Sequence, residues 1–116
     1  EAHGLAVLDD MFARGQLIES SILCANDRVA IGALRAASQH GLEPGAQRKG
    51  GLRIAGHDDY PLCPFTTPSL TTVAQNVTAI GQTAVDRLLE KLRAENISEN
   101  QVIRLMDGIL KIRESA

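Results

Sequence analysis

Apolar positions in the first part of the chain change from helical spacing to a short continuous run. Within residues 2–14, Leu5, Leu8 and Phe12 recur at the interval expected for one face of a helix. The run Ser20–Ala25 (SSILCA) is short and almost wholly apolar, as is typical of a strand buried on both faces. The pattern therefore predicts a helix followed by a buried strand.

A second helix and strand follow in the same rhythm. Asn26 or Asp27 can cap a helix that runs to His40, and Leu52–Gly56 predicts another short strand after a polar loop. The helix carries one stripe of small and aliphatic residues, namely Val29, Ala30, Ala33, Leu34 and Ala37. Helix–strand–helix–strand order implies parallel strands joined by a right-handed crossover. The sequence thus predicts an α/β fold, with a parallel sheet flanked by helices.

The second half of the chain is less regular at first. Three prolines between residues 61 and 68 disfavour regular structure there, and Leu70–Ala74 then alternates like an extended segment. Thr78–Ala94 has the clearest helical periodicity in the chain. Val102–Leu105 and Ile109–Ile112 are predicted as two brief strands.

Composition narrows the class of protein. The chain has 116 residues, 44% apolar and 3% aromatic, so it can form one domain at most, with an aliphatic core. A net charge of −2 gives no electrostatic case for nucleic-acid binding by this chain. No stretch of about 18 apolar residues is present to span a membrane, and the N-terminus does not resemble a signal peptide. The first residue is Glu1 rather than Met, from which we expect a piece of a larger protein.

Polar residues follow both predicted strands. Asn26-Asp27 comes after the first strand and Asp58-Asp59 after the second. Adjacent parallel strands would bring both pairs to one edge of the sheet, where α/β proteins bind small molecules. Carboxylates accept hydrogen bonds from hydroxyls, and an amide both donates and accepts, so the pair suits a polyol. The alternative is that Asp27 caps its helix and Asp59 caps a turn, with no ligand.

Catalytic and metal-binding patterns are missing from the sequence. It contains no Ser or Cys nucleophile motif, no H-E-x-x-H and no Gly-rich phosphate loop before a helix. His57, Asp58 and Asp59 are consecutive, so their side chains diverge rather than converge on a metal ion. We therefore expect no catalytic residue, no metal and no cofactor.

Five collinear segments resemble the lactose-repressor family of bacterial regulators. Ser21–Leu42 resembles its strand–AND–helix segment, and Ile54–Asp59 (IAGHDD) its V-x-G-[FY]-D-[DN] turn. Thr67–Gln75 (TPSLTTVAQ) is similar to TPPLTTV-x-Q, Ile80–Leu92 to the family's MG-x-x-A-x-x-L-L helix, and Leu110–Ala116 to its L-V-x-RES tail. Five matches in the same order are far more specific than any one motif.

The resemblance implies a periplasmic-binding-protein-like effector domain, built from two Rossmann-like subdomains joined by three crossovers. Residues 1–72 would belong to the C-terminal subdomain. Residues 73–116 would provide a crossover, a helix of the N-terminal subdomain and the returning C-terminal strand. The resemblance implies that the parent is a cytoplasmic, dimeric transcription regulator that responds to a small effector, which we expect to be a sugar. It would contact DNA only through an N-terminal head that this chain lacks.

The resemblance also assigns residues to the effector and to the dimer. Asn26 and Asp58 match positions that hydrogen-bond effector hydroxyls, and Gln75 matches a crossover position near the effector. The matching dimer-interface positions are Val29, Ala30, Ala33, Leu34, Ala37, Leu62 and Phe65. One departure is His57, which stands where the family usually has Phe or Tyr.

Two other classes of protein compete with the regulator. A periplasmic sugar-binding protein for transport shares the fold, but the TTPSLTTVAQ segment and the RES tail favour the regulator. A metal- or cofactor-dependent enzyme would need a convergent ligand cluster, which the sequence does not indicate.

Overall fold

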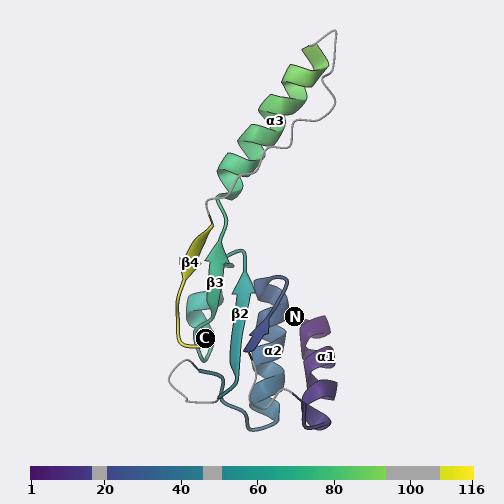
Figure 1. The fold of residues 1–116 in the computed structure, drawn as a ribbon, viewed down its shortest axis with the longest axis vertical. Coiled ribbons are helices and arrows are strands. Elements are labelled where there is room, and N and C mark those ends of the chain that lie inside the picture. The colour runs from purple at the N-terminus through teal and green to yellow at the C-terminus, as the bar shows by residue number, and fades with distance from the viewer. Residues whose placement is uncertain (17–20, 46–50, 94–107) are drawn as a thin grey trace. The chain divides into compact units, whose positions relative to one another are not determined.

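The computed structural model describes residues 1–16, 21–45, 51–93 and 108–116 (Figure 1). In chain order its elements are α1 (Ala2–Ala13), β1 (Ser21–Leu23), α2 (Asp27–Gln39), β2 (Arg53–His57), the 3-10 turn η1 (Cys63–Phe65), β3 (Thr71–Ala74), α3 (Val77–Arg93) and β4 (Ile109–Lys111). They form two compact units, residues 1–74 with 109–116, and residues 75–108. The strand predicted at residues 102–105 lies outside the described residues.

The first unit is built on a four-stranded sheet in the order β1-β2-β3-β4. β1, β2 and β3 are parallel, with Leu23 opposite Ala55 and Gly56 opposite Thr72. β4 runs antiparallel to β3 and places Leu110 opposite Val73. The predicted α/β fold with a parallel sheet is therefore confirmed, and β4 adds an antiparallel edge.

Helices α1 and α2 pack closely together beside the sheet (Figure 1). A side chain at Gly4 would collide with the backbone of Val29, and one at Gly32 with the backbone of Glu1. Two glycines at the contact therefore let the helix backbones approach each other. The core beneath is aliphatic apart from one ring and two thiols, and it consists of Leu8, Phe12, Cys24, Ala30, Ala33, Leu34, Ala36, Ala37, Leu52, Ile54, Cys63 and Leu70.

The prediction that β1 is buried on both faces is wrong. Ile22 packs against the core next to the fully buried Ile54, but Leu23 points to the opposite face and remains 78% exposed. A continuous apolar run shows that a strand can be buried, but not whether both faces are covered. Within the described residues, only one face of β1 is packed.

The C-terminal tail after β4 docks between β2 and β3. The hydroxyl of Ser115 donates to the carbonyl of Ile54 at 2.6 Å and accepts from the backbone N–H of Thr71 at 2.9 Å. Glu114 accepts from the backbone N–H and the hydroxyl of Ser69, each at 2.9 Å. Ser115 is fully buried, so the tail is anchored to the sheet although it is not a strand itself.

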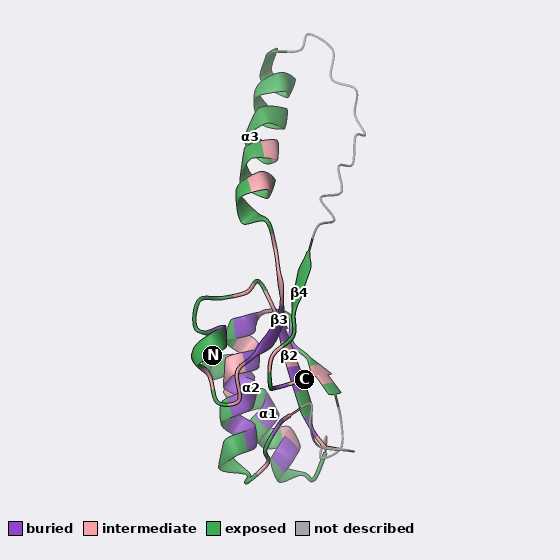
Figure 2. Cartoon of the chain, turned by 90° about the vertical axis from the view of Figure 1, so that its left-hand side faces the viewer, coloured by how far each residue is buried: buried purple, intermediate pink, exposed green. Residues whose placement is uncertain are grey.

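The second unit contains α3, whose start is capped by Asn76 through a 3.0 Å bond from the N–H of Ala79. The predicted helix is confirmed within one residue at each end. None of its residues is buried among the described part of the chain, and its ribbon in Figure 2 is green and pink without purple. None of the described helices has the length and apolar character needed to cross a bilayer.

Candidate functional site

The carboxyl ends of the parallel strands bring two of the predicted site residues to one edge of the sheet. Asn26 lies three residues after the end of β1, and Asp58 directly follows β2. Because β1 and β2 are parallel neighbours, both residues lie at the same edge, where open α/β sheets bind ligands. Gln75 directly follows β3 and is the first residue of the second unit.

Asn26 is the N-cap of α2. Its Oδ1 accepts a 3.0 Å hydrogen bond from the backbone N–H of Val29, and its own backbone is extended. The alternative that Asp27 caps this helix is therefore wrong. With Oδ1 occupied by the helix, the amide Nδ2 is the group of Asn26 that remains to donate to a ligand.

Asp58 and Asp59 form an unusual turn. Their φ angles are 112° and 54°, in the left-handed region that non-glycine residues rarely adopt. The N–H of Asp58 continues the strand ladder to the carbonyl of Val73 at 2.9 Å. Its carboxylate is half exposed and lies 3.1 Å from Nδ1 of His57. Such backbone strain costs about 1–3 kcal/mol per residue and is concentrated at functional sites.

Beneath this turn, Asp27 is a buried carboxylate with only 1% of its surface exposed. It accepts from the backbone N–H of Tyr60 at 2.6 Å and from the hydroxyl of Thr72 at 2.5 Å. Burial is the main cause that raises the pKa of the Cys63 thiol to about 12, and a hydrogen bond to Asp27 adds to it. A side chain at position 56 would collide with the Asp27 carboxylate, so Gly56 makes room for it. Asp27 thus ties the start of α2 to β3 and to the turn after β2.

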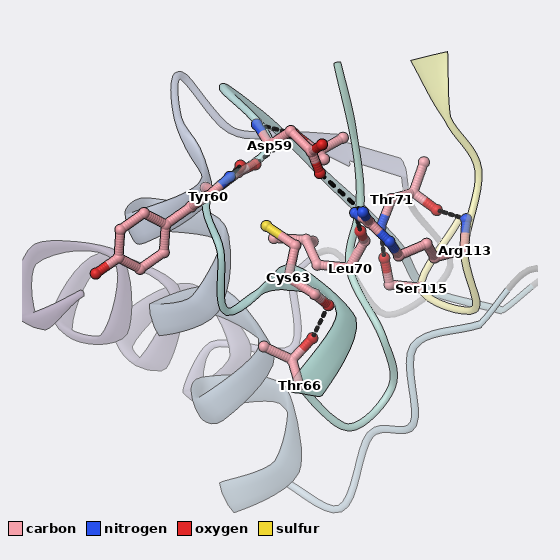
Figure 3. Close-up of polar contacts among 10 residues, drawn as sticks. Asp59, Tyr60, Cys63, Thr66, Leu70, Thr71, Arg113 and Ser115 are labelled. Carbon is pink, nitrogen blue, oxygen red and sulfur yellow. Dashed lines mark hydrogen bonds and ion pairs between the residues drawn. The ribbon is translucent and has the colours of Figure 1, made fainter. Parts of the chain in front are cut away.

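Asp59 is held from the other side by the C-terminal tail, as Figure 3 shows. Nη2 of Arg113 lies 2.8 Å from Oδ1 of Asp59, and Nη1 donates to the carbonyl of Leu70 at 2.7 Å. The backbone N–H of Arg113 donates to the hydroxyl of Thr71 at 2.9 Å. The side chain of Asp59 is therefore a partner of Arg113.

The predicted dimer-interface residues separate into two groups. Ala30, Ala33, Leu34 and Ala37 are buried within this chain's own core, so assigning them to a surface between copies is incorrect. Their stripe packs inside the unit, where α2 contacts both α1 and β2. Leu62 and Phe65 are exposed, the latter to 82%, and Val29 is half buried.

The sequence placed Asp27 at this edge of the sheet without showing which groups it binds, and it did not indicate Arg113 as a site residue. Their partners lie 33 and 54 residues away in the chain, and a single sequence does not reveal such pairings. Within the described ranges, no group of three His, Cys, Asp or Glu residues could hold a metal ion.

Residues 4–116 match the family model of the periplasmic binding protein-like domain. The lactose operon repressor of Escherichia coli strain K12 is 36% identical over 87 residues, which cover 75% of this chain and 23% of that protein. The HTH-type transcriptional regulator MalR of Streptomyces coelicolor is 45% identical over 73 residues, which cover 63% of this chain and 20% of that protein.

A crystal structure of the Lac repressor dimer bound to operator and the anti-inducer ONPF matches with a TM-score of 0.78 and 32% identity. The match covers 97% of this chain and 36% of that one, so the chain spans about a quarter to a third of such proteins. The chain belongs to the periplasmic binding protein-like domain family and corresponds to part of the effector-binding domain of lactose-repressor-type regulators.

Proposed function

We propose that this chain is the effector-sensing part of a cytoplasmic, lactose-repressor-type transcription regulator, and that its effector is a sugar. The observation that carries the proposal is Asp58: a half-exposed carboxylate at the carboxyl edge of a parallel sheet, on a backbone with φ of 112°. Two relatives are named as repressors of the lactose and ribose operons, which supports a sugar as effector.

The polar groups assigned to this site suit a ligand with several hydroxyls. The carboxylate of Asp58 accepts hydrogen bonds, whereas Nδ2 of Asn26 donates because Oδ1 already caps α2. Gln75, the first residue after β3, also carries an amide and is the third residue that the resemblance assigns to the effector. A sugar hydroxyl can donate to the carboxylate of Asp58 and accept from the amide of Asn26.

In the full-length protein, residues 1–72 would belong to the C-terminal subdomain. Residues 73–116 would supply the crossover, a helix of the N-terminal subdomain and the returning strand. The effector would shift an equilibrium between two arrangements of the protein, of which one binds operator DNA through an N-terminal head. The exposed Leu62 and Phe65, with Val29 beside the site, would contribute to a homodimer contact.

The test is calorimetric titration of the full-length protein with glucose, galactose, ribose, maltose and lactose. Asp58→Asn keeps the shape and removes the charge, and it should weaken binding of the tightest sugar about tenfold to a hundredfold, since a hydrogen bond to a charged group contributes about 1.5–3 kcal/mol. Asp10→Asn, which removes an exposed carboxylate of α1 paired with Arg14, is the matched control and should change nothing.

A gel-shift assay with the promoter DNA of the protein's own gene separates a regulator from a transport protein. The Asp58→Asn protein should still shift the DNA, but release it only at higher sugar concentration. Equal sugar affinity in the Asp58→Asn and unmodified proteins would remove Asp58 from the site, and absence of any DNA shift would contradict the regulatory function.

A further inference from the structure

We propose that Arg113 is a positioning residue for effector binding, which holds the turn that presents Asp58 through its ion pair with Asp59. The inference rests on the proposed function, because Asp58 is the carboxylate assigned there to the effector. It extends the site to the C-terminal tail, from which no effector contact has been proposed.

The ion pair between Arg113 and Asp59 is short and largely shielded from water. The guanidinium of Arg113 reaches Oδ1 of Asp59 at 2.8 Å with one nitrogen and the carbonyl of Leu70 at 2.7 Å with the other. The side chain of Arg113 is 18% exposed and that of Asp59 is 27% exposed, so water competes little for either. A planar guanidinium fixes direction as well as charge, which a lysine does not. One side chain thereby joins the turn to the residue before β3 (Figure 3).

The turn needs such a contact because of its backbone. Asp58 and Asp59 both have positive φ, and non-glycine residues keep that conformation only when their surroundings enforce it. The N–H of Asp59 has a long 3.4 Å bond to the hydroxyl of Thr72. The ion pair of Asp59 with Arg113 is shorter and charged, and therefore holds Asp59 more firmly. Since Asp58 is the preceding residue, fixing Asp59 also limits where the carboxylate of Asp58 can point.

Arg113 can act on the turn because its own backbone is fixed independently. Glu114 is bound to Ser69, and Ser115 is bound to Ile54 and Thr71. Removing the Arg113 side chain should therefore leave the tail docked. Glu114 also offers a matched control, because it anchors the same tail and no contact with the turn is observed for it.

The first test is amide hydrogen exchange, measured by NMR or mass spectrometry on the full-length protein. Arg113→Met should accelerate exchange in the 58–60 turn by about tenfold or more, because local opening becomes easier once the anchor is lost. Glu114→Gln should change exchange in the turn by less than about twofold, since its contacts are to Ser69. Unchanged amide exchange in the turn of the Arg113→Met protein overturns the proposal, whatever the measured sugar affinity is.

The second test is the affinity for whichever of glucose, galactose, ribose, maltose and lactose the unmodified protein binds most tightly. Arg113→Met should weaken it about tenfold, a coupling typical of residues in one network, and Arg113→Lys should recover part of the loss. Glu114→Gln should retain full affinity even if it lowers the unfolding temperature, which separates positioning of the turn from general stability.

The outcomes also separate this inference from the proposed function. Faster exchange in the turn of the Arg113→Met protein, together with unchanged sugar affinity, overturns the positioning role but leaves the sugar-sensing function intact. If none of the five sugars binds the unmodified protein, sensing of these sugars fails. Exchange in the turn then decides alone whether Arg113 holds it.

Discussion

Substitution of Asp27 by alanine tests the structural basis of the site most directly. Asp27 is almost completely buried and accepts hydrogen bonds from the N–H of Tyr60 and the hydroxyl of Thr72. Asp27→Ala removes both acceptor oxygens at once and leaves the two donors in an enclosed space. The turn after β2 then loses its link to α2, although every residue of the turn is unchanged.

The expected cost follows from the two orphaned donors. A buried polar group left without a partner costs about 1–3 kcal/mol, so two of them give about 2–6 kcal/mol of lost stability. Domains of ordinary size have a total free energy of unfolding of about 5–15 kcal/mol, so the change is large. Asp27→Asn keeps the volume and one acceptor oxygen, but its NH2 group must face one of the donors. It should therefore lose about half as much, roughly 1–3 kcal/mol.

The assay is urea unfolding followed by circular dichroism, with Thr72→Val as the matched variant. Thr72→Val deletes one donor with little change of shape and should cost about 1.5–3 kcal/mol in the unmodified background, because the hydroxyl donates to a buried carboxylate. In the Asp27→Ala background the same change should cost less, because the hydroxyl has already lost its acceptor. A loss below about 1 kcal/mol for Asp27→Ala, or strictly additive losses in the double variant, would refute the network as described.

Three further predictions concern the surroundings of Asp27. Burial raises the pKa of Cys24 to about 11 and that of Cys63 to about 12, so both thiols should resist a disulfide reagent at pH 8 in the native protein and react on unfolding. These raised pKa values also predict that the free energy of unfolding falls as the pH rises above 9, because the thiols of the unfolded chain lose protons that those of the folded chain retain. A constant free energy of unfolding between pH 8.5 and 10.5 would contradict this prediction. Gly56→Ala places a methyl group against the Asp27 carboxylate and should cost about 1–3 kcal/mol in urea unfolding, whereas a neutral result would show that the carboxylate can move aside.

Local patterns in the sequence predicted the elements well. Helical spacing and a capping Asn or Asp located α2 within a residue, and the strand ends correctly placed Asn26 and Asp58 at one edge. The partner of an apolar surface was harder to predict. The stripe of α2 that includes Ala33 shows that the helix buries one face, but not whether a helix of the same chain or a second copy covers it. Only the structure shows that the same chain covers α2, through both α1 and β2.

The long-range polar contacts could not be predicted from the sequence for a different reason. Consecutive acidic residues such as Asp58 and Asp59 look equivalent in a sequence, yet one is half exposed at the sheet edge and the other is paired with Arg113, 54 residues away. Alternation of side chains does not separate them either, because their positive φ angles break the strand pattern at that point. Only the folded chain assigns a role to each.

The acidic residues at the edge of the sheet have different roles, which explains how a rigid edge can still offer polar groups to a ligand. Asp27 on α2 accepts hydrogen bonds from Tyr60 in the turn and from Thr72 on β3, and Asp59 in the turn is paired with Arg113 of the C-terminal tail. The helix α2, the strand β3 and the tail therefore fix the turn. Asp58, between them, presents a half-exposed carboxylate at the edge of the sheet. A binding group held in place before the ligand arrives loses less conformational freedom on binding, so the cost of ordering the site is met during folding. Weakening Asp27 or Arg113 should therefore lower effector affinity without removing any atom that the effector touches.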